Sequence, residues 1–446
     1  MGKPLVLDGS SNCRLVAESI QAAIEDPHID RLIVSGIDLE CEIASSLLVL
    51  FKHRIHPWAE IVVRKCIGPI HGLLTLILEE SKASVDVLQL DNTVGKLGVS
   101  GAIRRGLSKN RDLCKVKEIA LTNSRLSAWI MEDLMTGICT HTGIRNLLFI
   151  ACEFIPSAAA ILSRGLKYSP HVQDLSLYGS KIDDYDLASV VDSCYNLTSI
   201  DLGHTDCGPK TISRLGFLLD SSRKSSNCKL TSLDINCHRH LGTSTPSGTD
   251  LTALFRGLTQ NSTVKHLDIT SLPLNDKSAE CLVTCLHNNV TLESMVLTDC
   301  GLSQVSMTLI LENLANFAGM RRLYMDGRHN LGLYGRQQWT ELATEALSTR
   351  NLLLEALYLP PAFDFYRAEM DQLLDRNLAG RRILLSDGMC KTSPTLQNPS
   401  AVWSHVLERV NKVALPDGCK RNPPSKAARR ADMTYYMLRQ RIMLEN

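Results

Sequence analysis

Hydrophobic residues recur along this chain with two alternating periods. Short segments follow the template L-x-x-L-x-L-x-x-x-x-L, whose fourth and sixth positions are two residues apart and therefore point to one face of a short strand. Clear copies read VQDLSLYGSKI, LTSIDLGHTDC, LTSLDINCHRH, VKHLDITSLPL and LESMVLTDCGL. Between copies the apolar spacing becomes helical, as for Leu251, Leu254 and Leu258. The pattern predicts one short strand and one helix in each unit.

Copies of this template recur at a nearly constant spacing. Twelve can be aligned, and their first positions are residues 29, 58, 85, 116, 144, 172, 197, 230, 264, 292, 320 and 354. The 325 residues between the first and last starts divide into eleven steps of about 29.5, a period typical of a solenoid. One strand and one helix cannot bury their apolar faces alone, whereas stacked units can. We therefore expect an α/β fold, a curved leucine-rich-repeat solenoid of about 12–13 repeats with a concave parallel β-sheet and convex helices.

The repeat resembles a known type. The period near 28 residues, the helix-forming segments and the cysteines at the ninth template position, Cys66 and Cys152, resemble ribonuclease-inhibitor-type leucine-rich repeats. The resemblance covers roughly residues 1–380. It implies binding of another protein on the concave face or on the loops at the strand ends, as in ribonuclease inhibitors, innate immune receptors, Ran GTPase activators and actin-capping proteins. It names no partner, because a fold does not fix a function.

The two ends of the chain depart from the repeat. Residues 1–28 are predicted to form an N-terminal cap, with a strand over Leu5 to Leu7 followed by a helix. The solenoid is expected over 29–385, and 386–446 read as a linker and a helical C-terminal extension that contains Trp403. Two long loops, 238–250 and 327–338, are candidates for carrying function.

Asparagine precedes several strand motifs by three residues, at the expected helix ends. The residues are Asn261, Asn289 and Asn351. Asparagine tolerates the left-handed conformation in which many helices end. We expect these residues to adopt it.

Composition narrows the function classes. Hydrophobic residues make up 44% of the 446-residue chain, charged residues 21%, and the formal net charge is +1, so no overall attraction to nucleic acid or an anionic membrane is expected. The apolar runs are too short to span a bilayer, and the N-terminus has no cleavage-like site of a secretory signal. Fifteen scattered cysteines then indicate reduced thiols in a cytoplasmic protein. The basic segment CKRNPPSKAARR leaves a nuclear location open.

Polar residues at the solvent-facing template positions are the candidate contact groups. The fifth position holds Asp201, Asp234 and Asp268 in three consecutive repeats, with Asp174 at the third position of the preceding unit. Neighbouring strands lie about 4.8 Å apart, so the carboxylates would form a ladder that attracts a basic partner. An ordinary solvated surface explains the same pattern. The remaining candidates are Tyr178, His266, Arg322 and Tyr324, which make the face change from acidic to basic along the chain.

Catalytic and metal-binding hypotheses are weaker. His204, Cys207, Cys237, His238 and His240 share one edge of two adjacent repeats, but they lack C-x-x-C spacing, and buried template positions explain the cysteines. Nucleotide-binding and hydrolase motifs are absent from the sequence.

We therefore predict a non-catalytic intracellular protein-binding scaffold or regulator without cofactor or metal. Nucleic acid, membrane and small-molecule substrates are not expected as partners. The alternative is a GTPase-activating regulator, similar to Ran activators, that acts through the loop residue Arg125.

Overall fold

The chain divides into two compact units. A computed structural model describes residues 3–8, 13–39, 42–109, 115–222, 228–237, 250–327, 336–349, 353–359, 370–371, 373–374 and 377. Unit 1 is Met1–Val264 and unit 2 is Lys265–Asn446. The predicted C-terminal extension, Asn351 and most of the two long loops lie outside the described residues. The predicted boundaries at 28 and 385 therefore stay predictions.

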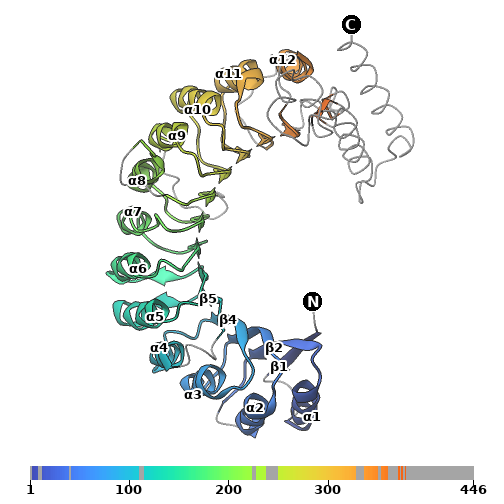
Figure 1. Cartoon of the computed structure of the whole chain (residues 1–446), viewed down its shortest axis with the longest axis vertical. Coiled ribbons are helices and arrows are strands. Elements are labelled where there is room, and N and C mark those ends of the chain that lie inside the picture. Colours follow the sequence, from blue (N-terminus) through green and yellow to red (C-terminus); the bar gives the residue numbers. More distant parts are fainter. Residues whose placement is uncertain are drawn as a thin grey trace, which may run out of the picture. The chain divides into compact units, whose positions relative to one another are not determined.

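Unit 1 alternates strands and helices (Figure 1). Its main parallel sheet contains β1 (Lys3–Asp8), β2 (Ile29–Ser35), β3 (Trp58–Arg64), β4 (Val85–Asp91), β5 (Glu118–Thr122), β7 (Asn146–Ile150), β9 (Asp174–Ser176), β10 (Ser199–Asp201) and β11 (Ser232–Asp234), in that order. A separate pair joins β6 (Arg125–Leu126) to β8 (Glu153–Phe154). The helices are α1 (Cys13–Glu25), α2 (Glu42–His53), α3 (Ile70–Thr75) with a π-helical turn at Leu76–Glu80, α4 (Val99–Lys109), α5 (Ala128–Thr140), α6 (Ala158–Lys167), α7 (Asp184–Val191), α8 (Pro209–Leu219) and α9 (Thr252–Thr259).

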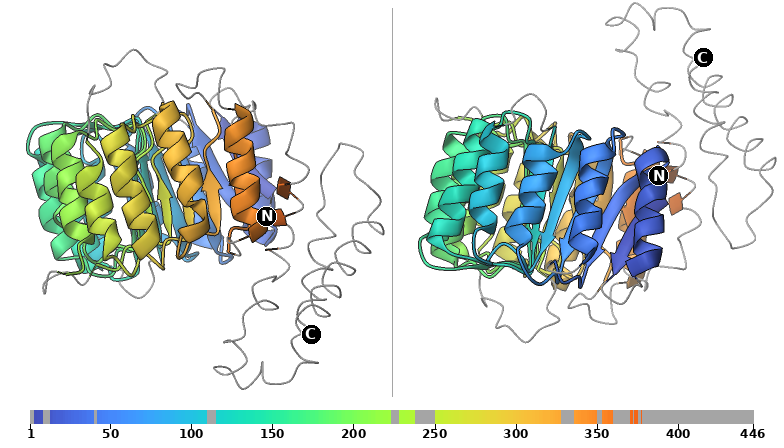
Figure 2. Two further views of the ribbon diagram at one scale, coloured as in Figure 1. Left: turned by 90° about the horizontal axis from the view of Figure 1, so that it is seen from above. Right: turned by 90° about the horizontal axis from the view of Figure 1, so that it is seen from below.

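Unit 2 continues the same alternation. Its elements are β12 (His266–Asp268), α10 (Asp276–Asn288), β13 (Ser294–Val296), α11 (Gln304–Asn313) with a 3-10 turn at Leu314–Asn316, β14 (Arg322–Tyr324), α12 (Arg336–Thr349) and β15 (Ala356–Tyr358). The four strands pair in parallel and in chain order. Within each unit the helices stand side by side on one face of the sheet, and no described helix covers the other face (Figure 2).

All twelve template copies coincide with strands. The observed strands β2 to β4 begin at the predicted first positions 29, 58 and 85, and the later ones begin two residues after theirs. Residues at the fourth and sixth positions pack against the helices, as Leu175 and Leu177 do at 2% and 0% exposure. The prediction of an α/β leucine-rich-repeat solenoid is confirmed. Among the described residues, no helix has both the length and the apolar character that a membrane span requires.

The chain turns sharply after each strand at the eighth template position. Residues there have φ between 50° and 94° in most described repeats, and they are Gly36, Lys65, Asn92, Asn123, Ala151, Gly179, His204, Ser271, Asp299 and Gly327. Their N–H groups donate to the next repeat, as Ala151 N does to Tyr178 O (2.8 Å) and His204 N to Asn236 O (2.8 Å). A left-handed residue other than glycine costs about 1 kcal/mol. The parallel pairing of neighbouring repeats offsets this cost.

Small donors at the ninth position tie several repeats to the preceding one. The thiol of Cys152 donates to Leu121 O (3.3 Å), that of Cys300 to Ile269 O (3.2 Å), and the hydroxyl of Ser180 to Phe149 O (2.8 Å). Burial raises the pKa of the Cys152 thiol to about 11, which keeps its proton in place. These cysteines thus use their buried S–H groups on carbonyl oxygens of the core.

The conformation predicted for the asparagines is wrong. Asn289 ends α10 in an extended conformation (φ −85°, ψ 116°), and Asn261 has no positive φ. Their buried side chains instead organise the approach to the next strand: Asn289 Oδ1 accepts from Leu292 N (2.8 Å), and Asn261 Oδ1 accepts from Val264 N (2.8 Å). Satisfying these buried N–H groups outweighs the left-handed preference of asparagine.

Candidate protein-binding face

The uncovered face of the unit 1 sheet presents three rows of side chains. We call them row 3, row 5 and row 7 after their template positions. Row 5 runs in register through Ile33, Val62, Gln89, Ala120, Leu148, Ser176, Asp201 and Asp234. Row 3 runs through Arg31, Glu60, Val87, Glu118, Asn146, Asp174, Ser199 and Ser232. Row 7 includes Arg64, Asp91, Thr122 and Ile150 in register, and Tyr178 by template position.

The predicted acidic ladder is present in part. Asp201 and Asp234 lie directly opposite one another on β10 and β11. Asp174 lies in row 3, where it pairs with Ser199 and not with Asp201. Asp268 is on β12 in unit 2 and is paired there with Val296. The structure therefore places two of the four carboxylates in one row of unit 1.

Each ladder carboxylate also holds the turn that follows its own strand. Asp201 Oδ1 accepts from Gly203 N (2.9 Å), Asp234 Oδ1 from Asn236 N (2.9 Å), and Asp268 Oδ1 from Thr270 N (2.8 Å). Asp201 Oδ2 also accepts from the Ser176 hydroxyl (2.7 Å). Aspartate is suited to this local turn because its short side chain reaches the N–H two residues ahead. These aspartates thus have a backbone role that the sequence analysis missed, although the D-x-[GNT] spacing signals it.

Tyr178 is the main exposed aromatic residue among the predicted contacts of unit 1. Its side chain is 39% exposed, and its ring lies 4.7 Å from that of His204. His204 has φ +58° at the eighth position, which places its ring beside the preceding repeat. Tyr178 is therefore pre-positioned at the strand end and offers an amphipathic surface of the kind enriched in interfaces.

The predicted contact residues of unit 2 fall into two rows. His266 and Arg322 are exposed and lie in one row, separated by Ser294. Tyr324 lies in the next row and stacks on Tyr358, with ring centroids 4.8 Å apart and planes 7° from parallel. Tyr358 was not predicted, although the repeated pattern R-x-L-Y and E-A-L-Y could have indicated it. Unit 2 thus presents a stacked tyrosine pair in one row and the exposed Arg322 in the adjacent row.

Aliphatic side chains on the uncovered face of unit 1 were missed. Row 5 carries Ile33, Val62, Ala120 and Leu148, and row 7 carries Ile150. Leu148 and Ile150 stay partly exposed. Strands such as NLLFI are apolar at consecutive positions, which is the pattern of a strand with apolar groups on both faces. This signal was available in the sequence.

The residues of the zinc hypothesis are not assembled in the described part of the chain. Burial raises the pKa of the Cys207 thiol, and the His204 ring faces Tyr178. Within the described ranges there is no cluster of three His, Cys, Asp or Glu side chains that could hold a metal ion. His238 and His240 lie outside these ranges.

Arg125, the residue of the GTPase-activation alternative, lies on β6 in the two-stranded sheet with β8. Its side chain is 74% exposed, and its Nε is 3.4 Å from Glu153 Oε2 on β8. The ion pair with Glu153 of the neighbouring repeat gives Arg125 a structural role.

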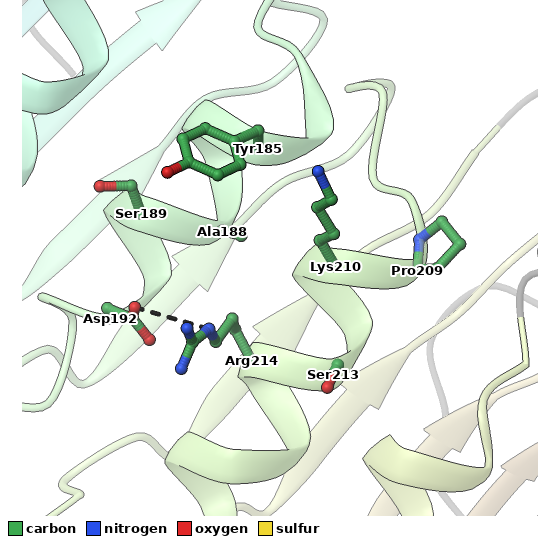
Figure 3. Close-up of a pocket in the computed structure, with 8 residues that line it drawn as sticks. All are labelled: Tyr185, Ala188, Ser189, Asp192, Pro209, Lys210, Ser213 and Arg214. Carbon is green, nitrogen blue, oxygen red and sulfur yellow. Dashed lines mark ion pairs between the residues drawn. The ribbon is translucent and has the colours of Figure 1, made fainter.

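A hollow of about 500 Å³ lies on the helical side between α7 and α8 (Figure 3). Lys210 Nζ lies 4.9 Å from the centre of the Tyr185 ring, and Arg214 pairs with Asp192 (3.6 Å). Ser189 and Ser213 complete the polar lining. Because Arg214 is already paired across the hollow, this surface offers less uncompensated charge than the sheet face.

The N-terminus of α8 is closed by a carboxylate from the preceding repeat. Asp184 Oδ1 accepts from Gly208 N and Thr211 N, and Oδ2 from Lys210 N, all at 2.9 Å. Burial acts to raise the pKa of Asp184, but the hydrogen bonds from Thr211, Lys210 and Gly208 outweigh it and lower the pKa. The carboxylate satisfies helix N–H groups and complements the helix dipole.

We expect Asp184→Ala to lower the free energy of unfolding by about 1–2 kcal/mol at pH 7. Because the folded pKa is below the ordinary value of 3.8, the contribution is complete above that value and disappears as the pH falls through the folded pKa. Urea unfolding at pH 7 and pH 3 should therefore show a difference from wild type that shrinks in acid. The exposed Asp206→Ala is the matched control, and an equal loss in both variants would contradict the capping role.

The chain is similar to known leucine-rich repeat proteins. It is 24% identical over 245 residues to leucine-rich repeat-containing protein 73 of Rattus norvegicus and, with the same figures, of Homo sapiens; the match covers 53% of this chain and 75% of each relative. No protein-family model matches the chain.

Two solved structures are similar to the chain at low TM-scores. An internalin from Listeria monocytogenes has a TM-score of 0.32 and 15% identity. The match covers 70% of this chain and 84% of the internalin chain. The TLR13 chain of the TLR13–ssRNA13 complex has a TM-score of 0.37 and 13% identity. The match covers 69% of this chain and 41% of that chain. The repeat geometry and the similarity to leucine-rich repeat-containing protein 73 together support a leucine-rich repeat protein.

Proposed function

We propose that the chain is a non-catalytic protein-binding scaffold or regulator, located in the cytoplasm, that contacts its partner through the uncovered sheet faces. One observation carries the proposal. In each unit, one face of the sheet has no helix of the described residues against it, and aromatic, acidic and basic side chains stand on that face in regular rows. Regular strands hold these groups at fixed spacings, which favours recognition of an extended partner surface.

The contact residues we propose are those singled out in the sequence. In unit 1 they are Asp174, Tyr178, Asp201 and Asp234, and in unit 2 they are His266, Asp268, Arg322 and Tyr324. Support comes from the exposure of Tyr178, His266 and Arg322 and from the stacking of Tyr324. Non-catalytic action is supported by the pairing of Arg125 with Glu153. Buried ninth-position donors, among them Cys66 and Cys152, support the ribonuclease-inhibitor-like repeat type.

The test compares proteins captured from native cell extract by the full chain and by two variant sets. The unit 1 set is Tyr178→Ser, Asp201→Asn and Asp234→Asn; the unit 2 set is Arg322→Gln and Tyr324→Ala. Asparagine keeps an oxygen that can accept the backbone hydrogen bond, so the turns should stay intact. We expect at least one protein captured by wild type to fall in captured amount by about tenfold or more with at least one variant set, as measured by quantitative mass spectrometry.

The matched control is Glu280→Gln/Glu312→Gln, which alters exposed acids on α10 and α11. Partners that survive both sheet-face sets but are lost from this control would contradict the proposal. Equal thermal unfolding of all variants is required before the comparison is made.

A further inference from the structure

The charges on the two faces of unit 1 are balanced differently. On the helical side, acids pair with bases of neighbouring repeats: Glu79 with Lys109, Asp133 with Arg104, Glu132 with Arg164, and Asp192 with Arg214. On rows 3, 5 and 7 of β4 to β11 there are five carboxylates and no Lys or Arg. The carboxylates are Asp91, Glu118, Asp174, Asp201 and Asp234. This face therefore carries an acidic excess that the whole chain, at +1, does not have.

Hydrogen bonds from uncharged donors position three of these carboxylates, those of Glu118, Asp174 and Asp91. Asn146 Nδ2 donates to Glu118 Oε2 (2.9 Å), the Thr198 hydroxyl to Asp174 Oδ1 (2.9 Å), and Asn123 Nδ2 to Asp91 Oδ1 (2.9 Å). All three donors are uncharged. Among the described residues, no ion pair includes Asp91, Glu118, Asp174 or Asp201.

The basic residues at the preceding template position, Lys117 and Arg145, contact other groups than these carboxylates. Lys117 pairs with Asp86 (3.2 Å), and Arg145 donates to His171 O (2.8 Å). Like charges fixed on adjacent strands reinforce one another's potential and attract a cationic partner. The acidic excess is thus a property of the folded face.

An apolar centre lies among these acids. Leu148, in row 5 of β7, is flanked by Glu118 on β5 and Asp174 on β9, both in row 3. Ile150 adjoins it in row 7, and both side chains are partly exposed. Strands are about 4.8 Å apart, so two strand steps place Glu118 and Asp174 roughly 10 Å from one another across β7.

We propose that this face, from β4 to β11, docks a basic amphipathic protein segment. Its apolar side chain covers Leu148 and Ile150, and its Lys or Arg side chains reach Glu118 and Asp174. The inference rests on the proposed function and specifies the chemistry of the partner in unit 1. Charge complementarity selects a cationic segment, and the apolar centre selects one that also carries an aliphatic or aromatic anchor. Two turns of helix span about 11 Å, so bases seven residues apart match the two acids.

The experiment uses the full chain and three synthetic 18-residue helical peptides as probes. One has Lys seven residues apart with Leu on the same side; the second has Glu in place of Lys; the third has Ser in place of Leu. Fluorescence anisotropy measures binding at low and at physiological salt. We expect saturable binding of the Lys/Leu peptide and at least tenfold weaker binding of the other two.

Two variants then locate the contact on the protein. Glu118→Gln/Asp174→Asn removes both charges but keeps an oxygen that can accept from Asn146 and Thr198. This double substitution should weaken binding of the Lys/Leu peptide about tenfold and reduce the dependence of binding on salt. Leu148→Ser should weaken binding by a similar factor and leave the salt dependence unchanged. The helix-side control Glu280→Gln/Glu312→Gln should bind as wild type does.

The outcomes separate this inference from the proposed function. Equal binding of all three peptides, or equal effects of the sheet-face and helix-side variants, would overturn the basic amphipathic partner. If extract proteins are nevertheless lost from the Tyr178 or Arg322 sets, protein binding stands and only the partner chemistry is wrong. If the peptides discriminate as expected and both charge and anchor variants weaken binding, the inference is supported.

Discussion

Replacing Arg54 by methionine is expected to lower the free energy of unfolding by about 4 kcal/mol. Arg54 follows α2 and is fully buried. Its Nε donates to His56 O (2.9 Å) and its Nη1 to Asp26 O (3.3 Å); further N–H groups donate to Ala23 O and Ile29 O. The guanidinium carbon also lies 4.0 Å from the centre of the Trp58 ring.

The large effect follows from what the substitution leaves behind. Four backbone carbonyls would lose this donor, those of Ala23, Asp26, Ile29 and His56, and of these Asp26 O still accepts from Ile29 N (3.3 Å). Each buried carbonyl left unpaired costs about 1–3 kcal/mol. Burial lowers the pKa of Arg54, and the nearby Asp26 and Asp30 act to raise it. Arg54→Lys should also destabilise, because a single ammonium cannot reach carbonyls arranged around a planar fork.

Urea unfolding followed by hydrogen exchange measures this effect. Lys52→Met, at an exposed position of α2, is the matched control and should stay within about 0.5 kcal/mol of wild type. In Arg54→Met, exchange should rise first in β1 and β2, since repeats unfold in neighbouring groups. If the two variants prove equally stable, the hydrogen bonds of Arg54 do not stabilise the first repeats.

The strands were predictable from sequence because the core leaves little choice at two template positions. Leu202 and Leu297 are fully buried in equivalent layers, and a polar residue there would cost several kcal/mol. The apolar spacing therefore survives in all twelve copies, even where the other positions differ. The division at residue 264 was not predictable, because the template continues across it without change.

The candidate site was predictable only in part, because an aspartate at a solvent-facing template position can serve several roles. Asp201 is equally suited to bind a partner and to accept from Gly203 N, and the sequence does not distinguish these uses. Leu148 and Phe149 are consecutive and apolar, and Leu148 is partly exposed on the uncovered face whereas Phe149 is buried. Only polar residues at the solvent-facing positions were predicted as contact groups, so the aliphatic centre of the proposed docking surface was missed.

Gly257→Ala is the second substitution with a large expected effect. Gly257 on α9 faces Gly216 on α8, and an added Cβ would meet the backbone oxygen, carbonyl carbon (2.8 Å) and Cα (2.9 Å) of Gly216. The clash is with backbone atoms, which cannot move aside as a side chain can, so the two helices must separate. Overpacking of this kind typically costs 1–3 kcal/mol, and we expect about 3 kcal/mol here.

The sign of the effect is the informative part, because alanine by itself favours a helix over glycine by about 1 kcal/mol. Gly101 on α4 provides the matched control, since its added Cβ would have only ordinary contacts with Arg105 Nη1 (3.6 Å) and Asp133 Oδ2 (3.8 Å). Gly101→Ala should therefore raise the urea midpoint, and Gly257→Ala should lower it. If both substitutions stabilise the chain, α8 and α9 do not approach as closely as the structure indicates. The spacing of the strands in front of these helices, and with it the spacing of Asp201 and Asp234, would then be set by the sheet alone.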